Sequence, residues 1–199
     1  YRDVSLQLME IFHQISPLVE PLSMDEAFLD ITHRVDPQTT PRRIAQDIKR
    51  RVQQELGLIV SCGVATSKSV AKIASDREKP DGLTVVAPGS EQAFLAPLPV
   101  GALWGIGPKT AERLHKAGVN TVGELAARPL PWLIERFGVR GEWFHRLANG
   151  NDNRPVIVGN DDIPGHDQSV VAGDGHVDRK GNNIRLCVEI GGGSLQPQA

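Results

Sequence analysis

The 199-residue sequence is poor in cysteine. It has only Cys62 and Cys187, which stand far apart and in no spacing typical of a metal site or a disulfide framework. This excludes a small disulfide-stabilised secreted domain and is typical of a reducing compartment, so we expect a cytoplasmic protein. Cys62 lies in an apolar segment and is predicted to be an ordinary small core residue.

Long apolar runs and a signal peptide are also missing from the sequence, so we expect no membrane partner. The net charge is −2, from 22 basic and 24 acidic residues. Overall charge therefore gives no indication of nucleic-acid or membrane binding. Any attraction for a polyanion must come from a local cluster of charge.

One local cluster lies between Pro41 and Pro80, where there are nine basic and four acidic residues. The basic residues are Arg42, Arg43, Lys49, Arg50, Arg51, Lys68, Lys72, Arg77 and Lys79. Such a run is more often a solvated helix face than a binding surface. It becomes a candidate for phosphate binding only where a nearby site requires the negative charge of a phosphate to be neutralised.

The most informative stretch is residues 23–30 (SMDEAFLD), in which two adjacent carboxylates precede a short segment, residues 27–31, that is predicted to form a strand. Neighbouring strand residues point to opposite faces, so a tight turn at the start of the stretch would be required to bring Asp25 and Glu26 to one side. Carboxylate oxygens suit Mg²⁺, which keeps several waters and leaves room for substrate phosphates. An Asp-Glu pair alone is otherwise more often a solvated turn.

Apolar periodicity predicts helices and strands in alternation over the first half of the chain. Helices are expected from the start of the sequence to Pro17, from Thr40 and Pro41 to Gly57, and over residues 66–79, with further strands over 58–64 and 83–87. Gly63, inside a short β-branched segment, predicts a close approach of another part of the backbone.

A segment rich in proline and small residues, 88–99, predicts a boundary before an all-helical unit. Residues 105–109 (GIGPK) place a glycine-flanked hairpin at the start of a helix, where free N–H groups and Lys109 favour a phosphate. A Gly-x-Gly turn alone is weak evidence, and the third glycine of the nucleotide-binding Gly-x-Gly-x-x-Gly motif is missing.

After Gly150 the composition changes to glycine and aspartate with few sustained apolar periods. We expect an irregular segment over residues 151–199, disordered or derived from a shifted reading frame. One strand over 184–190 is the exception that the pattern allows.

Four motifs occur in a fixed order: SMDEAFLD at 23–30, SCGVATSKSVAKIAS at 61–75, KPDG at 79–82 and GIG at 105–107. In this combination the chain resembles the Y-family translesion DNA polymerases of the bacterial DNA polymerase IV type, from about Tyr1 to about Pro155. The order makes the resemblance far more specific than any single motif.

The resemblance implies an α+β fold with a partial polymerase palm over residues 1–98, built as a mixed sheet with helices on one face. A small helical thumb with a helix-hairpin-helix would follow over 99–150, and the irregular tail over 151–199. The implied activity is template-directed, lesion-bypass DNA synthesis, in which a primer 3′-hydroxyl attacks a deoxynucleoside triphosphate with the help of two Mg²⁺ ions. Primer–template DNA is the implied partner, with a sliding clamp contacted through regions outside this chain.

The resemblance also implies roles for particular residues. Asp25 and Glu26 would be the catalytic metal ligands, and Lys79 would hold the triphosphate as a point charge. The thumb residues that would grip the DNA backbone without reading bases are Gly105, Gly107 and Lys109. Ser23 would shape the turn, and Asp30 would be structural.

Some parts of the family pattern are not matched. The first metal-binding aspartate, the fingers and the steric gate of the family precede the position of Tyr1, and residues 156–199 do not resemble its DNA-gripping domain. We therefore expect that this chain alone does not polymerise. The alternative is a non-catalytic DNA-binding accessory protein related to these polymerases, although such a protein has no need of Asp25, Glu26 and Lys79 together. A globular domain in which the motifs have no role would require four coincidences in order.

Overall fold

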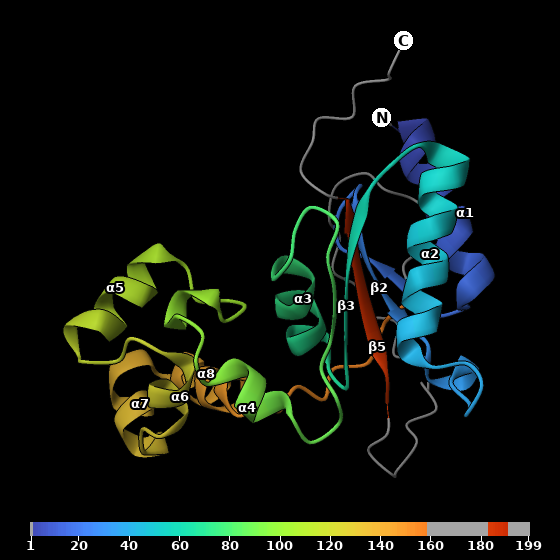
Figure 1. Ribbon diagram of the computed structural model, residues 1–199. Coiled ribbons are helices and arrows are strands. Elements are labelled where there is room, and N and C mark those ends of the chain that lie inside the picture. The colour runs from blue at the N-terminus through green and yellow to red at the C-terminus, as the bar shows by residue number, and fades with distance from the viewer. Residues whose placement is uncertain (1, 159–182, 191–199) are drawn as a thin grey trace.

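The computed structural model describes residues 2–158 and 183–190 (Figure 1). A five-stranded sheet with the order β1-β2-β5-β3-β4 forms the centre of one half, and short helices form the other. The strands are β1 (Val19–Pro21), β2 (Glu26–Asp30), β3 (Val60–Ala65), β4 (Leu83–Val85) and β5 (Arg185–Ile190). The helices that cover the sheet are α1 (Arg2–Ile15), α2 (Pro41–Leu56) and α3 (Lys68–Asp76).

Local sequence explains where these helices begin and end. In α2 the Thr40 hydroxyl accepts a hydrogen bond from the Arg43 amide, Pro41 occupies the first turn, and Gly57 ends the helix in the left-handed region at φ 67°. The α3 helix has the same kind of start, because the Ser67 side chain accepts from the Val70 amide. The helices predicted from periodicity are therefore confirmed, with ends displaced by a few residues.

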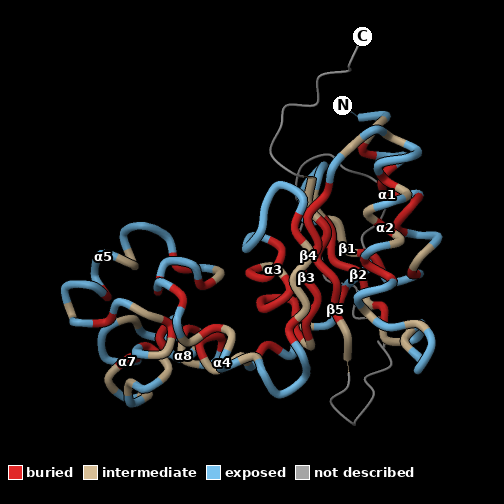
Figure 2. The backbone as a smooth tube through the Cα atoms, in the orientation of Figure 1, coloured by how far each residue is buried: buried red, intermediate tan, exposed pale blue. Residues whose placement is uncertain are grey.

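The sheet carries helices on both faces, so the expectation of helices on one face is wrong, although the mixed α+β class is confirmed. Figure 1 shows α1 and α2 on one side of the strands and α3 on the other. The cause lies in β2, where Ala27 and Leu29 enter the core beneath α1 and α2, while Phe28 enters the core on the α3 side. A strand that is buried on both faces requires a cover on each (Figure 2).

The strand predicted over residues 184–190 is present as β5, but its place is unexpected. It lies between β2 and β3 and pairs antiparallel with both, so the segment predicted to be an irregular tail supplies the centre of the sheet. Leu186 and Val188 enter the α1–α2 core, and Cys187 faces α3. The expectation of irregular structure over residues 159–182 and 191–199 concerns positions outside the described residues.

The helical half contains α4 (Glu91–Leu95), α5 (Pro108–Lys116), α6 (Val122–Ala126), α7 (Leu130–Phe137) and α8 (Val139–Ala148). The α6 helix starts with a complete capping box between Thr121 and Glu124. The core of this half is continuous with the α3 side of the sheet, and the rings of Phe28 and Trp104 lie 5.8 Å apart between their centroids. No helix within the described residues is long and apolar enough to cross a bilayer.

Asp152 ties the end of the helical half to α3, one of the helices that cover the sheet. Its buried carboxylate accepts hydrogen bonds from the Ser69 amide at the start of α3 (3.0 Å) and from the Arg154 guanidinium (2.8 Å), which lies over the rings of Trp104 and Trp143. Burial alone would raise the pKa of Asp152, but the hydrogen bonds and charge of Arg154 outweigh it and hold the pKa below its ordinary value.

We expect Asp152→Asn to lower the free energy of unfolding at pH 7 by on the order of 2 kcal/mol, because it breaks charged hydrogen bonds of a buried group. A depressed pKa stabilises the folded state above the unfolded pKa, and this contribution is lost as the pH falls through the folded pKa. The difference between wild type and variant should therefore shrink below about pH 3.8. Urea unfolding at several pH values measures it.

The control for this prediction is Asp81→Asn, which removes an ion pair with Lys49 from a carboxylate that is 70% exposed. An exposed pair of this kind contributes about 0–1 kcal/mol. Equal losses of stability in the two variants at pH 7 would contradict a stabilising role for the hydrogen bonds that Asp152 accepts from Ser69 and Arg154.

Candidate catalytic site

The acidic pair lies at the end of a β-hairpin formed by β1 and β2. The Leu22 and Ser23 amides donate to the Glu26 carbonyl (2.8 and 3.2 Å), which closes the turn, and the Ser23 hydroxyl donates to the Asp25 carboxylate (2.5 Å). The predicted turn at the start of the SMDEAFLD stretch is therefore present. It places exposed Asp25 in the loop and makes half-buried Glu26 the first residue of β2.

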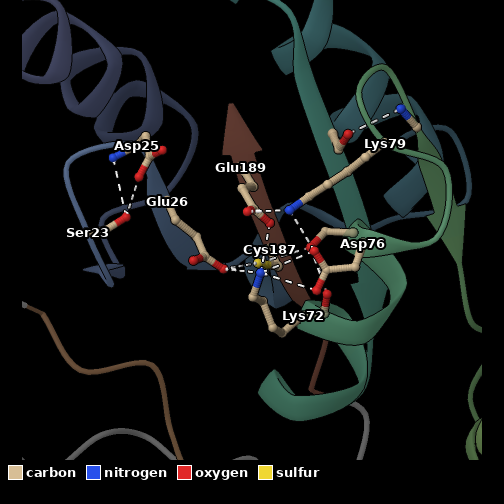
Figure 3. A network of polar contacts seen from close by, with 11 residues as sticks. Ser23, Asp25, Glu26, Lys72, Asp76, Lys79, Cys187 and Glu189 are labelled. Carbon is tan, nitrogen blue, oxygen red and sulfur yellow. Dashed lines mark hydrogen bonds and ion pairs between the residues drawn. The ribbon is translucent and has the colours of Figure 1, made fainter. Parts of the chain in front are cut away.

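The two carboxylates have different partners. Asp25 lies beside Ser23, whereas the Glu26 side chain is directed toward Lys72 of α3 (Figure 3). Within residues 2–158 and 183–190 no group of three or more acidic, histidine or cysteine side chains is arranged to hold a metal ion. Asp30, further along β2, accepts from the Thr32 amide and hydroxyl and is ion-paired with Arg185, which agrees with the structural role expected for it.

Glu26 belongs to a partly buried group of charges that we term the Glu189 network. Its members are Glu26, Lys72, Asp76, Lys79 and Glu189. Glu26 and Glu189 are direct partners across β2 and β5, an arrangement of like charges that destabilises a sheet unless a cation intervenes. The Lys72 ammonium supplies that cation, at 3.0 Å from Glu26 and 2.8 Å from Glu189 (Figure 3).

Lys79 completes the network at the exposed side. Its ammonium is paired with Glu189 and lies 2.6 Å from Asp76. Burial lowers the pKa of both lysines, but the hydrogen bonds that the ammonium groups donate to the surrounding carboxylates outweigh it and raise the pKa of Lys72 and of Lys79. Both ammonium groups are therefore charged at neutral pH.

The structure brings one of the two predicted catalytic carboxylates, Glu26, and the predicted substrate-binding residue, Lys79, into one network. Glu26 and Lys79 are far apart in the sequence, yet both meet the network around Glu189, and the Ile190 amide donates to the Asp25 carbonyl (3.0 Å). Sequence reasoning missed Glu189 and Asp76 as members. The SKSVAKIAS motif contained a signal for Lys72, but no sequence signal connected Glu189 with this edge of the sheet.

Burial affects the cysteine beside this network. The Cys187 thiol lies 3.5 Å from the Glu26 carboxylate, and its pKa is raised by burial first and by that negative charge second. Burial likewise raises the pKa of Cys62 to about 12. Both cysteines are free and buried, so the prediction of an ordinary core position for Cys62 is confirmed.

The predicted thumb residues lie at the start of α5, which belongs to the helical half (Figure 1). Gly105 has a φ of 92°, a conformation that favours glycine, and Gly107 caps α5. Pro108 and exposed Lys109 form the first turn of that helix. The hairpin predicted from the GIGPK segment is therefore present, with Lys109 at the start of the helix.

The basic cluster between Pro41 and Pro80 does not form one surface. Its residues divide between α2 on one face of the sheet and α3 with the turn that follows it on the other (Figure 1). Several are ion-paired, in the pairs Lys49–Asp81, Arg50–Asp47, Arg51–Glu55 and Lys68–Glu20. The α2 part therefore fits a solvated, internally paired helix face rather than a binding surface.

Known protein families match the two parts of the chain that contain the acidic pair and the α5 hairpin. Residues 1–76 match the family model described as the impB/mucB/samB family, and residues 88–119 match the IMS family HHH motif. A DNA polymerase IV of Pseudomonas paraeruginosa is 48% identical over 158 residues, and one of Desulfatibacillum aliphaticivorans is 44% identical over 156 residues. The chain belongs to the Y family of DNA polymerases.

Solved structures of Y-family polymerases share the fold. A ternary complex of Dbh is 30% identical with a TM-score of 0.72, and a DinB family error-prone DNA polymerase from Sulfolobus solfataricus is 29% identical with the same score. Each comparison covers 78% of this chain but 47% of the other. The two curated relatives are covered over 45% and 39% of their own length, so the chain spans less than half of each.

Proposed function

We propose that this chain is the palm-and-thumb part of a template-directed, lesion-bypass DNA polymerase, which transfers a nucleotide from a deoxynucleoside triphosphate to a primer 3′-hydroxyl. The observation that carries the proposal is the chain of ion pairs that links Glu26 to Lys79 through Lys72 and Glu189. This link joins a candidate metal ligand to a candidate phosphate-binding lysine at one end of strands β2 and β5. The relatives that are named DNA polymerase IV support the same reading.

In this proposal Asp25 and Glu26 would hold Mg²⁺, two ions being expected in the complete site. The donor set fits in its chemistry, since adjacent Asp25 and Glu26 both offer carboxylate oxygens, and hard oxygen ligands suit this ion. When bound, the metal supplies positive charge to the attacking and leaving oxygens. Lys79, with its raised pKa, would hold the triphosphate with a permanent positive charge.

Primer–template DNA would bind through the α5 hairpin. Gly105 and Gly107 carry no side chains and are exposed, and Lys109 presents a charge in the first turn of the helix, where the helix dipole also favours phosphate. Contacts of this kind position the backbone and carry no base specificity. A sliding clamp, met through regions outside this chain, would be a further partner in the bacterial cytoplasm.

The proposal includes inactivity of this chain by itself. Lys79 is held by Glu189 and Asp76, and Asp25 and Glu26 have separate partners, so metal and triphosphate would both have to displace existing contacts. The second candidate function is a non-catalytic DNA-binding accessory protein. The observation that favours it is the full pairing of Lys72 and Lys79 with carboxylates.

We expect the chain to bind primer–template DNA with an affinity that falls with salt, and Lys109→Ala to weaken binding equally for two unrelated sequences. The slope of log K against log salt should become shallower by about one, because one phosphate contact is lost. Fluorescence anisotropy over a salt series measures both. In the same mixtures, Mg²⁺ and nucleotides should give no primer extension.

The matched control is Lys116→Ala in the last turn of the same helix, where the lysine is ion-paired with Glu112 at 2.7 Å. This variant should keep the wild-type slope. Equal effects of the two substitutions, or a loss at Lys109 that depends on sequence, would contradict phosphate binding by the hairpin. Mg²⁺-dependent extension by this chain that disappears in Glu26→Gln would overturn its inactivity and exclude the accessory role.

A further inference from the structure

Glu189 is placed by β5 directly on the lysine that the proposed function assigns to the triphosphate. One carboxylate oxygen meets the Lys79 ammonium, and the other lies 2.8 Å from the Lys72 ammonium (Figure 3). The Glu189 side chain is 17% exposed. A single carboxylate therefore spans both ammonium groups of the network.

An ammonium group has three N–H donors and uses the same donors for carboxylate and phosphate oxygens. Lys79 already donates to Glu189 and Asp76, and Lys72 contacts Glu26, Glu189 and Asp76. A phosphate that approaches Lys79 therefore meets an occupied cation, and it is also repelled by the carboxylates around that cation.

The two carboxylates on Lys79 differ in how easily they can leave. Asp76 lies at the end of α3, three residues before Lys79, and its side chain is 47% exposed, so it can rotate into solvent. Glu189 is held in register between β2 and β3, opposite Glu26 and Ser61. Its backbone is fixed by the sheet and its side chain is less exposed than that of Asp76, so Glu189 is the more persistent occupant.

We propose that Glu189 is an internal competitor for phosphate at Lys79, an autoinhibitory contact built into the central strand of the sheet. The inference rests on the proposed function, since it takes Lys79 as the phosphate-binding lysine. Ligands that carry several phosphate groups, such as nucleoside triphosphates, would bind strongly only when the Glu189 charge is removed or β5 is displaced.

Inorganic tripolyphosphate tests the proposal in the full chain, by calorimetric titration at low salt without divalent metal. Glu189→Gln keeps the shape and removes the charge, and we expect it to bind tripolyphosphate at least roughly tenfold more tightly than wild type. Glu189→Thr, whose β-branched side chain suits a strand, should give the same gain if Gln fails to fold. Adding Lys79→Ala to either variant should abolish the gain.

The matched control is Glu55→Gln, which removes the same charge from an exposed pair with Arg51 on α2, on the opposite face of the sheet. It should bind as wild type does. An equal gain in this control would show a general effect of net charge, and a gain that persists without Lys79 would show that the phosphate binds another group. Either result would overturn the proposal.

Two further outcomes separate this inference from the proposed function. If wild type binds tripolyphosphate through Lys79 and both Glu189 variants bind equally well, Glu189 is no competitor, while the phosphate role of Lys79 stands. If tripolyphosphate binds no variant, or binds all of them without regard to Lys79, the assignment of Lys79 fails and the competition fails with it.

Discussion

Replacing Gly63 by alanine is expected to lower the free energy of unfolding by roughly 3 kcal/mol or more, or to prevent folding. Gly63 lies in β3 directly beneath α3, where an added Cβ would stand 2.0 Å from the Ala71 carbonyl oxygen and 2.3 Å from the Ser75 amide nitrogen. Both atoms belong to the backbone of α3, so no side-chain rotation relieves the clash. The helix would have to move away from the sheet.

A displaced α3 would also disturb the Glu189 network, because Lys72 and Asp76 are carried by that helix. Urea unfolding followed by circular dichroism measures the loss of stability. The control is Gly101→Ala in the helical half, where the nearest atom to an added Cβ is 3.6 Å away, an ordinary contact. Similar stabilities for the two variants would contradict the close approach of α3 and β3.

Gly63 also illustrates what the sequence can predict. A glycine inside a strand weakens it, so its presence there often marks a place where another part of the backbone comes close. The structure confirms this for Gly63, which lies against the backbone of α3. The ends of α2 follow from Thr40, Pro41 and Gly57 because capping is a local interaction. Features that depend on neighbouring residues were therefore predictable from one sequence.

The place of β5 was not predictable in this way. Pairing between segments that are distant in the sequence depends on which strands have an unpaired edge. The residues of Arg185–Ile190 contain no local pattern that indicates pairing with β2 and β3. The second covered face was missed for a related reason. Ala27, Phe28 and Leu29 are consecutive apolar residues, and such a run does not say which side chains face which core.

The candidate site was predictable in its parts but not in its contacts. The motifs supplied Asp25, Glu26 and Lys79, and the structure adds that Glu26 and Lys79 are linked through Lys72 and Glu189. Sequence spacing could not provide that link, because the link requires one end of β2 and of β5 to meet α3. The metal and phosphate roles of these residues are proposals that the experiments above test.

We expect Leu186→Ala to lower the free energy of unfolding by about 2–5 kcal/mol, as large-to-small changes in a packed core do. Leu186 is fully buried in β5 and stands in register between Leu29 of β2 and Val64 of β3, so its loss opens a cavity at the centre of the sheet. Urea unfolding measures the change.

The control is Leu6→Ala, the same substitution at a position of α1 that is 50% exposed, which should change stability by less than about 0.5 kcal/mol. If both variants lose equally little stability, β5 does not lie in the sheet, and Glu189 is not placed against Lys79. If only Leu186→Ala is destabilised, tripolyphosphate gives a second readout. Because a weakened β5 releases Glu189 more often, this variant should bind tripolyphosphate more tightly than wild type under conditions in which it remains folded.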